Sequence, residues 1–133
     1  MEQRLFTDDY NLFLNYSCVT EDPSRYSYMS QMDLLTVVEE FDNHDFPLDV
    51  IWLDIDYTDS YKYFTWDYTA FPEPEEMQRA LDVKGRKLVV IIDPHFKVDE
   101  DYFVFQIGTE RGYFVMNPDG SVFEGDCWPG LSR

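Results

Sequence analysis

Apolar residues in this chain alternate between two spacings, and this alternation constrains the fold more than any other feature. Ser30 is a residue type favoured at helix N-caps, and residues 31–41 after it carry apolar side chains at helical spacing. Val50–Ile55 is instead a nearly continuous apolar run, as in a strand covered on both faces. The helical pattern returns at 74–81, with Gly85 as its expected C-cap, and a second buried strand is predicted at Leu88–Ile92.

The last third of the chain continues the alternation. Residues 98–112 predict a third helix and 113–116 a third strand, while Asn-Pro-Asp-Gly at 117–120 predicts a β-turn that lets 121–125 pair back as a hairpin. Strands separated by helices form parallel sheets with right-handed crossovers. We therefore expect an α/β fold with about three parallel strands and intervening helices, either a small open sheet or part of a larger barrel.

Composition and charge narrow the classes of partner. The chain has 133 residues, enough for one modest domain, and 44% of them are apolar, which is typical of a globular protein. The net charge of −17 argues against binding to nucleic acid or to an anionic membrane surface. No stretch approaches the roughly 20 apolar residues of a transmembrane helix, so we expect no membrane insertion.

The cysteines and the N-terminal residues give little information about the cellular compartment. Cys18 and Cys127 lack the spacing of a metal or redox motif, and whether they pair stays open. The first residues carry acidic side chains and no long apolar run, so they do not resemble a signal peptide. The chain would then be cytoplasmic if it were complete.

Carboxylates follow both predicted strands. Asp54 and Asp56 come after the first strand, where an extended chain would place them on one face, and Asp93 and His95 come after the second. Ligands of parallel α/β folds bind at the carboxyl ends of the strands. These side chains could act as acid and base on a glycosidic bond, bind a divalent metal, or accept hydrogen bonds from sugar hydroxyls. The structural alternative is that they cap loops and helices, and their spacing is unlike that of a metal site, so we expect neither metal nor cofactor.

Several longer motifs carry a resemblance to a known family. They are DVIWLDIDYTD at 49–59, FPEPEEM at 71–77, GRKLVVIIDPHFKVD at 85–99 and GYFVMNPDGSVFEGDCWPG at 112–130. In this order they resemble the family 31 glycoside hydrolases over about residues 24–130. The DPH and CWPG segments are similar to the branch that trims glucose from N-glycans in the endoplasmic reticulum.

The resemblance implies a fold and a reaction. Residues 24–133 would form part of a (β/α)8 TIM-barrel domain, and residues 1–23 a divergent, irregular N-terminal extension. The family hydrolyses terminal α-glucosides with retention, using an aspartate nucleophile and an aspartate acid/base. Both lie downstream of the CWPG motif in family members, so the resemblance places no catalytic residue in this chain.

What can be carried over is substrate binding. Asp54 resembles the aspartate that hydrogen-bonds sugar hydroxyls in the −1 subsite. Ile55 and Ile91 resemble apolar residues of that pocket, Trp128 resembles an aromatic wall, and Tyr26 matches a further aromatic residue. Asp56 and Asp93 would orient loops without touching the sugar.

Two functions follow as expectations. In the first, the chain supplies part of the −1 subsite of an α-glucosidase that acts on an α-glucoside or N-glycan oligosaccharide in the endoplasmic reticulum lumen, where the resemblance implies a non-catalytic β-subunit as a partner. In the second, it is a truncated, non-catalytic product with weak sugar binding or a protein-interaction role through its exposed sheet edge.

Overall fold

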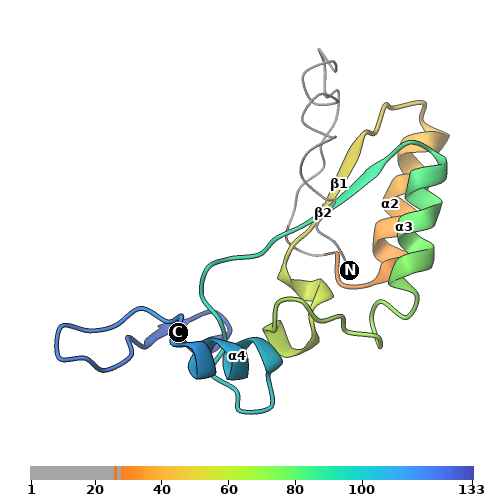
Figure 1. Ribbon diagram of the computed structural model, residues 1–133. Coiled ribbons are helices and arrows are strands. Elements are labelled where there is room, and N and C mark those ends of the chain that lie inside the picture. Colours follow the sequence, from red (N-terminus) through yellow and green to blue (C-terminus); the bar gives the residue numbers. More distant parts are fainter. Residues whose placement is uncertain (1–25, 27) are drawn as a thin grey trace.

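The computed structural model describes Tyr26 and residues 28–133 (Figure 1). The extension expected at 1–23, and Cys18 with it, lies outside these residues. The elements in chain order are α2 (Gln31–Asn43), β1 (Val50–Leu53), the 3₁₀ turns η1 (Ile55–Tyr57) and η2 (Asp59–Tyr61), α3 (Pro74–Val83), β2 (Lys87–Val90), α4 (Phe103–Arg111), β3 (Gly125–Cys127) and β4 (Gly130–Ser132). This is the alternation of helix and strand that the apolar spacing predicts.

Helix α2 begins where the sequence predicts. The Ser30 hydroxyl accepts a hydrogen bond from the backbone N–H of Asp33 at 3.1 Å, which satisfies one of the free donors of the first turn. Leu34 and Val38, one turn apart, are the buried residues of the helix. The helix ends at Asn43, shortly before Pro47.

Helix α3 covers the strands next to α2 (Figure 1). Pro74 occupies its first turn, where no backbone N–H is needed, and Met77 and Leu81 are its buried apolar side chains. The chain then reverses at Gly85, whose φ of 71° is the left-handed conformation that glycine adopts without a Cβ clash. The C-cap of α3 is Lys84, so the prediction of Gly85 as the C-cap was wrong by one residue.

Strands β1 and β2 pair in parallel, with Val50 opposite Lys87 and Leu53 opposite Val90. Both are shorter at their carboxyl ends than the sequence predicts. The first strand stops at Leu53 because the side chain of Asp54 accepts a hydrogen bond from the next backbone N–H and starts η1. The parallel pair packs against α2 and α3. Leu88 and Val90 of β2 are partly buried against a core of buried apolar residues from α2, β1, η1, α3 and the flanking loops: Tyr28, Leu34, Val38, Leu48, Ile51, Leu53, Tyr57, Phe71, Met77 and Leu81.

The expected third parallel strand at 113–116 was wrong. In the described residues the parallel sheet holds β1 and β2 alone. Met116 instead forms an antiparallel bridge with Val122, and the Phe123 N–H donates to the Val115 carbonyl at 2.7 Å. The turn at 117–120 places an antiparallel partner directly beside 113–116, so this segment pairs locally. The predicted hairpin is thereby confirmed.

Helix α4 and the C-terminal hairpin form a second cluster beyond the ends of the strands (Figure 1). The hairpin of β3 and β4, which the sequence pattern did not predict, is antiparallel, and Val98 N–H donates to the Leu131 carbonyl at 2.8 Å. Phe96 and Arg133 exchange backbone hydrogen bonds of 2.9 Å in both directions. The loop after β2 is therefore attached to the hairpin that carries Trp128.

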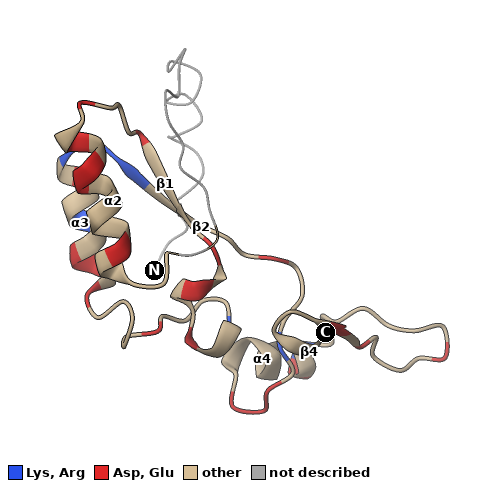
Figure 2. Cartoon of the chain, turned by 180° about the vertical axis from the view of Figure 1, so that it is seen from behind, with Lys and Arg blue, Asp and Glu red and all other residues tan. Residues whose placement is uncertain are grey.

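Acidic residues are distributed over helices and loops at both ends of the molecule (Figure 2). Within the described residues, no helix has both the length and the apolar character that a membrane crossing requires.

Candidate functional site

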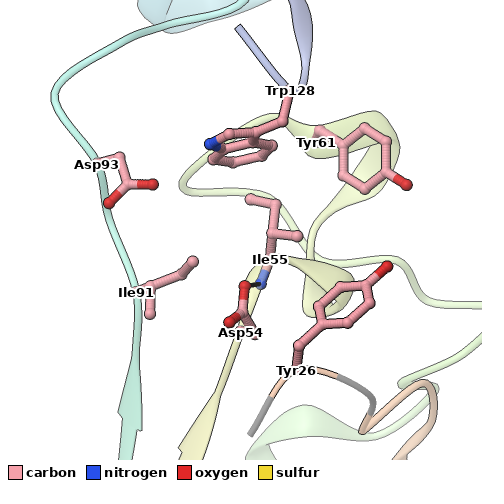
Figure 3. Close-up of a pocket in the computed structure, with 7 residues that line it drawn as sticks. All are labelled: Tyr26, Asp54, Ile55, Tyr61, Ile91, Asp93 and Trp128. Atoms are coloured by element: carbon pink, nitrogen blue, oxygen red, sulfur yellow. Dashed lines mark hydrogen bonds between the residues drawn. The ribbon is translucent and has the colours of Figure 1, made fainter.

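A pocket of about 500 Å³ opens beyond the carboxyl ends of β1 and β2. All five residues that the sequence predicted for substrate binding line it, and two further residues join them (Figure 3). The lining residues are Tyr26, Asp54, Ile55, Tyr61, Ile91, Asp93 and Trp128. Side chains from separate parts of the chain are thus brought to one place, which is where parallel α/β folds bind their ligands.

A hydrogen bond from the next backbone N–H holds the Asp54 side chain at the base of the pocket. Asp54 follows β1 directly, and its Oδ1 accepts a hydrogen bond of 2.7 Å from the Ile55 N–H. The expectation that Asp54 and Asp56 share one face of an extended chain was wrong, because the chain enters the 3₁₀ turn at Ile55. The turn directs Asp54 and Ile55 into the pocket, whereas Asp56 is not among its lining residues.

Asp56 is partly buried and does not line the pocket. Its Oδ2 is buried and has no hydrogen-bond partner in the described part of the chain. Burial, and then the Asp54 charge, raise the pKa of Asp56. The Asp56 charge in turn is the largest cause that raises the pKa of Tyr26. The base of the pocket is therefore an electronegative region, which suits hydroxyl donors better than anionic ligands.

Residues that follow β2 form the side of the pocket opposite Asp54. The Tyr57 hydroxyl donates a hydrogen bond of 3.0 Å to the Ile91 carbonyl, which joins η1 to the first residue after β2. Ile91 and Asp93 both line the pocket. Sequence reasoning assigned Asp93 only to loop orientation, although its place two residues after Ile91 was the available signal that both side chains lie on one face.

The sequence did not predict Tyr61 as a pocket residue, because its position depends on an unusual backbone conformation. Ser60 and Tyr61 have φ angles of 54° and 62°, in the left-handed region that residues with a Cβ seldom occupy. Lys97 Nζ donates to the Ser60 carbonyl at 3.0 Å, which helps to hold this conformation. Tyr61 then packs edge-to-face on Trp128, with ring centroids 6.0 Å apart. Strained backbone of this kind concentrates at binding sites.

The metal-site alternative has no support in the geometry. Among the described residues, no group of three or more histidine, cysteine, aspartate or glutamate side chains is arranged to hold a metal ion. Whether Cys18 and Cys127 form a disulfide also stays open, since Cys127 is exposed and Cys18 lies outside the described residues.

Comparison with known proteins identifies the family. Residues 22–133 match the model of the glycosyl hydrolases family 31 TIM-barrel domain. The chain is 55% identical over 108 residues to neutral alpha-glucosidase C of Mus musculus and 51% identical over 108 residues to a probable glucan 1,3-alpha-glucosidase of Arabidopsis thaliana. Each alignment covers 81% of this chain and 12% of the relative, so the chain spans about an eighth of the length of these proteins.

A solved structure shares the same arrangement. It is a crystal structure of the ER glucosidase II heterodimeric complex of a catalytic subunit with the binding domain of a regulatory subunit. The chains superpose with a TM-score of 0.82 at 47% identity, over 84% of this chain and 12% of the other. The motif order, the pocket at the strand ends and these matches agree: the chain belongs to glycoside hydrolase family 31, and it forms part of the family's TIM-barrel domain.

Proposed function

We propose that this chain is part of the catalytic domain of a retaining α-glucosidase and that it supplies one side of the pocket that binds the terminal glucose. The observation that carries the proposal is the meeting of Asp54, Ile91 and Trp128 in one pocket at the strand ends. The catalytic subunit of ER glucosidase II, 47% identical, gives the reaction class.

The pocket has the chemistry that a neutral sugar requires. The Asp54 carboxylate accepts hydrogen bonds from sugar hydroxyls, and the Trp128 and Tyr26 rings present faces to the apolar side of a pyranose. Ile55 and Ile91 provide apolar contacts between these groups. We propose that the roles of all five residues are binding and orientation of the glucose ring.

The bond-breaking groups come from other parts of the longer relatives. Retaining hydrolysis needs two carboxyl groups about 5–5.5 Å apart, one as nucleophile and one as acid and then base. By the family resemblance neither Asp54 nor Asp56 has these roles. Holding the glucose ring against the nucleophile is what this part of the domain contributes, since orientation lowers the barrier.

The relatives also suggest a setting. The solved complex is that of an endoplasmic-reticulum enzyme with the binding domain of a regulatory subunit. We propose by analogy that the protein to which this segment contributes trims glucose from N-glycans in the endoplasmic reticulum lumen with such a subunit. The alternative is a non-catalytic product that binds α-glucosides weakly or associates through its sheet edge, and hydrolysis separates the two.

A chimaera tests the proposal. The matching 108-residue segment of mouse neutral alpha-glucosidase C is replaced by that of this chain, and hydrolysis of p-nitrophenyl α-D-glucoside is measured. We expect an active chimaera in which Asp54→Ala lowers kcat/KM by about 100-fold or more, because hydrogen bonds to sugar hydroxyls strengthen in the transition state. The matched control is Asp126→Ala at an exposed carboxylate of β3, with activity near that of the parent chimaera.

Two results would contradict the proposal. A folded chimaera without activity would show that the segment cannot support hydrolysis and would favour the non-catalytic alternative. An Asp54→Ala chimaera with the kinetics of the Asp126→Ala control would remove Asp54 from the sugar site.

A further inference from the structure

Two of the buried polar atoms without a partner lie beside Trp128. In the described part of the chain, the Tyr63 hydroxyl and His95 Nε2 are buried and unpaired. Such atoms are uncommon in folded proteins and cost stability compared with apolar side chains of similar shape. Core packing alone therefore does not account for a tyrosine and a histidine at these positions. Both rings contact Trp128, which lines the pocket.

The rings surround the indole at nearly right angles. The centroid of the His95 ring is 4.8 Å from that of Trp128 with an interplanar angle of 83°, and the Tyr63 ring is 6.0 Å away at 88°. Tyr61 adds a third contact of 6.0 Å at 87°. Edge-to-face arrangements are the favoured geometry of aromatic pairs, so each contact restrains the tilt of the indole plane.

Tyr63 is the fixed member of this group. Its side chain is 1% exposed, and its carbonyl accepts a hydrogen bond of 2.9 Å from the buried hydroxyl of Tyr102. Its ring also packs edge-to-face on Phe96 at 6.2 Å. Trp128, in contrast, is 44% exposed in the turn between β3 and β4. The orientation of Trp128 therefore depends on its aromatic neighbours more than on its own backbone.

We propose that Tyr63 and His95 are positioning residues of the sugar site: their ring edges set the angle of Trp128. Neither residue lines the pocket itself. The benefit to glucoside binding rests on the proposed function, whereas the control of Trp128 does not. The test is designed so that the two can fail separately.

The first measurement concerns Trp128 alone. The full chain is labelled with 5-fluorotryptophan, which gives one ¹⁹F signal for each of its three tryptophans, and Trp128→Phe assigns one of them. We expect Tyr63→Leu and His95→Leu to shift or broaden the Trp128 signal and to leave the other two in place. Tyr63→Phe retains the ring and should retain the Trp128 signal. Tyr68→Leu, at an exposed tyrosine in the same loop, is the matched control.

The second measurement adds the ligand. Methyl α-D-glucoside is titrated into the same samples and its dissociation constant is measured by NMR. Loss of one aromatic pair should raise Kd by about 2- to 12-fold in Tyr63→Leu and His95→Leu. Tyr63→Phe retains the ring contact with Trp128 and should bind with a Kd near that of wild type.

The outcomes are distinct. An unchanged Trp128 signal in both leucine variants would overturn the proposal. Should Tyr63→Leu disturb all three signals, the variant is unfolded, and His95→Leu at its half-buried position decides in its place. If the Trp128 signal moves as expected while the chimaera described above hydrolyses no glucoside, the control of Trp128 stands and the proposed function fails.

Discussion

The hydrogen bond between the Tyr57 hydroxyl and the Ile91 carbonyl is a side-chain link at the strand ends that form the pocket, beside the backbone hydrogen bond of 3.1 Å from the Ile91 N–H to the Leu53 carbonyl. Tyr57→Phe removes the side-chain hydrogen bond and keeps the ring, which packs against Trp66 with centroids 5.1 Å apart. The Tyr57 side chain is 3% exposed, so water does not readily replace the lost donor. An unpaired acceptor costs about 1–3 kcal/mol when it is fully buried. Because this hydrogen bond is part-buried, we expect the free energy of unfolding to fall by about 1–2 kcal/mol.

Urea unfolding at neutral pH measures this change. For a domain of this size the dependence on urea is about 1–3 kcal/mol per molar, so the midpoint should fall by about 0.5–1 M. The control is Tyr68→Phe at an exposed tyrosine, whose midpoint should stay near that of wild type. A Tyr57→Phe midpoint equal to that of the control would refute the reasoning, because the strand ends would then be held without this hydrogen bond.

The same residue makes a second measurement possible. Burial raises the pKa of Tyr57 to about 12, whereas an unfolded tyrosine titrates near 10. The folded state therefore binds the proton more tightly. The resulting stabilisation is complete below pH 10 and is lost as the pH rises through about 12. Tyr57→Phe should reduce the decline of the unfolding midpoint between pH 10 and 12, and an unchanged decline would contradict the assignment.

Two further predictions concern the scaffold. The hydrogen bonds from Arg86 and then from Lys84 lower the pKa of Asp42 to about 2, so the stability from this group is present above about pH 4 and is lost as the pH falls through about 2. Asp42→Asn should therefore flatten the dependence of Tm on pH in this acidic range, and a parallel curve would exclude Asp42 as its source. Met77→Ala, which opens a cavity in the core, should lower the free energy of unfolding by about 2–5 kcal/mol, whereas Met32→Ala at an exposed position of α2 should change it little. Equal effects in urea unfolding would place Met77 outside the core.

Local patterns were sufficient for the elements that flank the site. The Ser30 cap, the apolar spacing of α2 and α3 and the continuous runs of β1 and β2 depend on neighbours within a few residues. The motif resemblance then selected five pocket residues that the structure brings together, Tyr26, Asp54, Ile55, Ile91 and Trp128. Their roles in sugar binding remain a prediction.

The errors occurred where the pairing partner of a strand-like segment could not be read from its own composition. Residues 113–116 have the composition of a strand, but the turn after them offers Val122 as a nearer partner than the parallel sheet. β3 and β4 are short and contain no β-branched residue, so their pairing has no pattern to read and depends on the loop at 96–98.

The sequence alone determined the family and the α/β alternation, because periodicity, caps and long motifs are properties of neighbouring residues. Only the tertiary structure decided the form of the pocket. The left-handed backbone at Ser60 and Tyr61, held by Lys97, and the rings around Trp128 require contacts across long stretches of chain. Such contacts depend on how the elements pack, which no local pattern encodes.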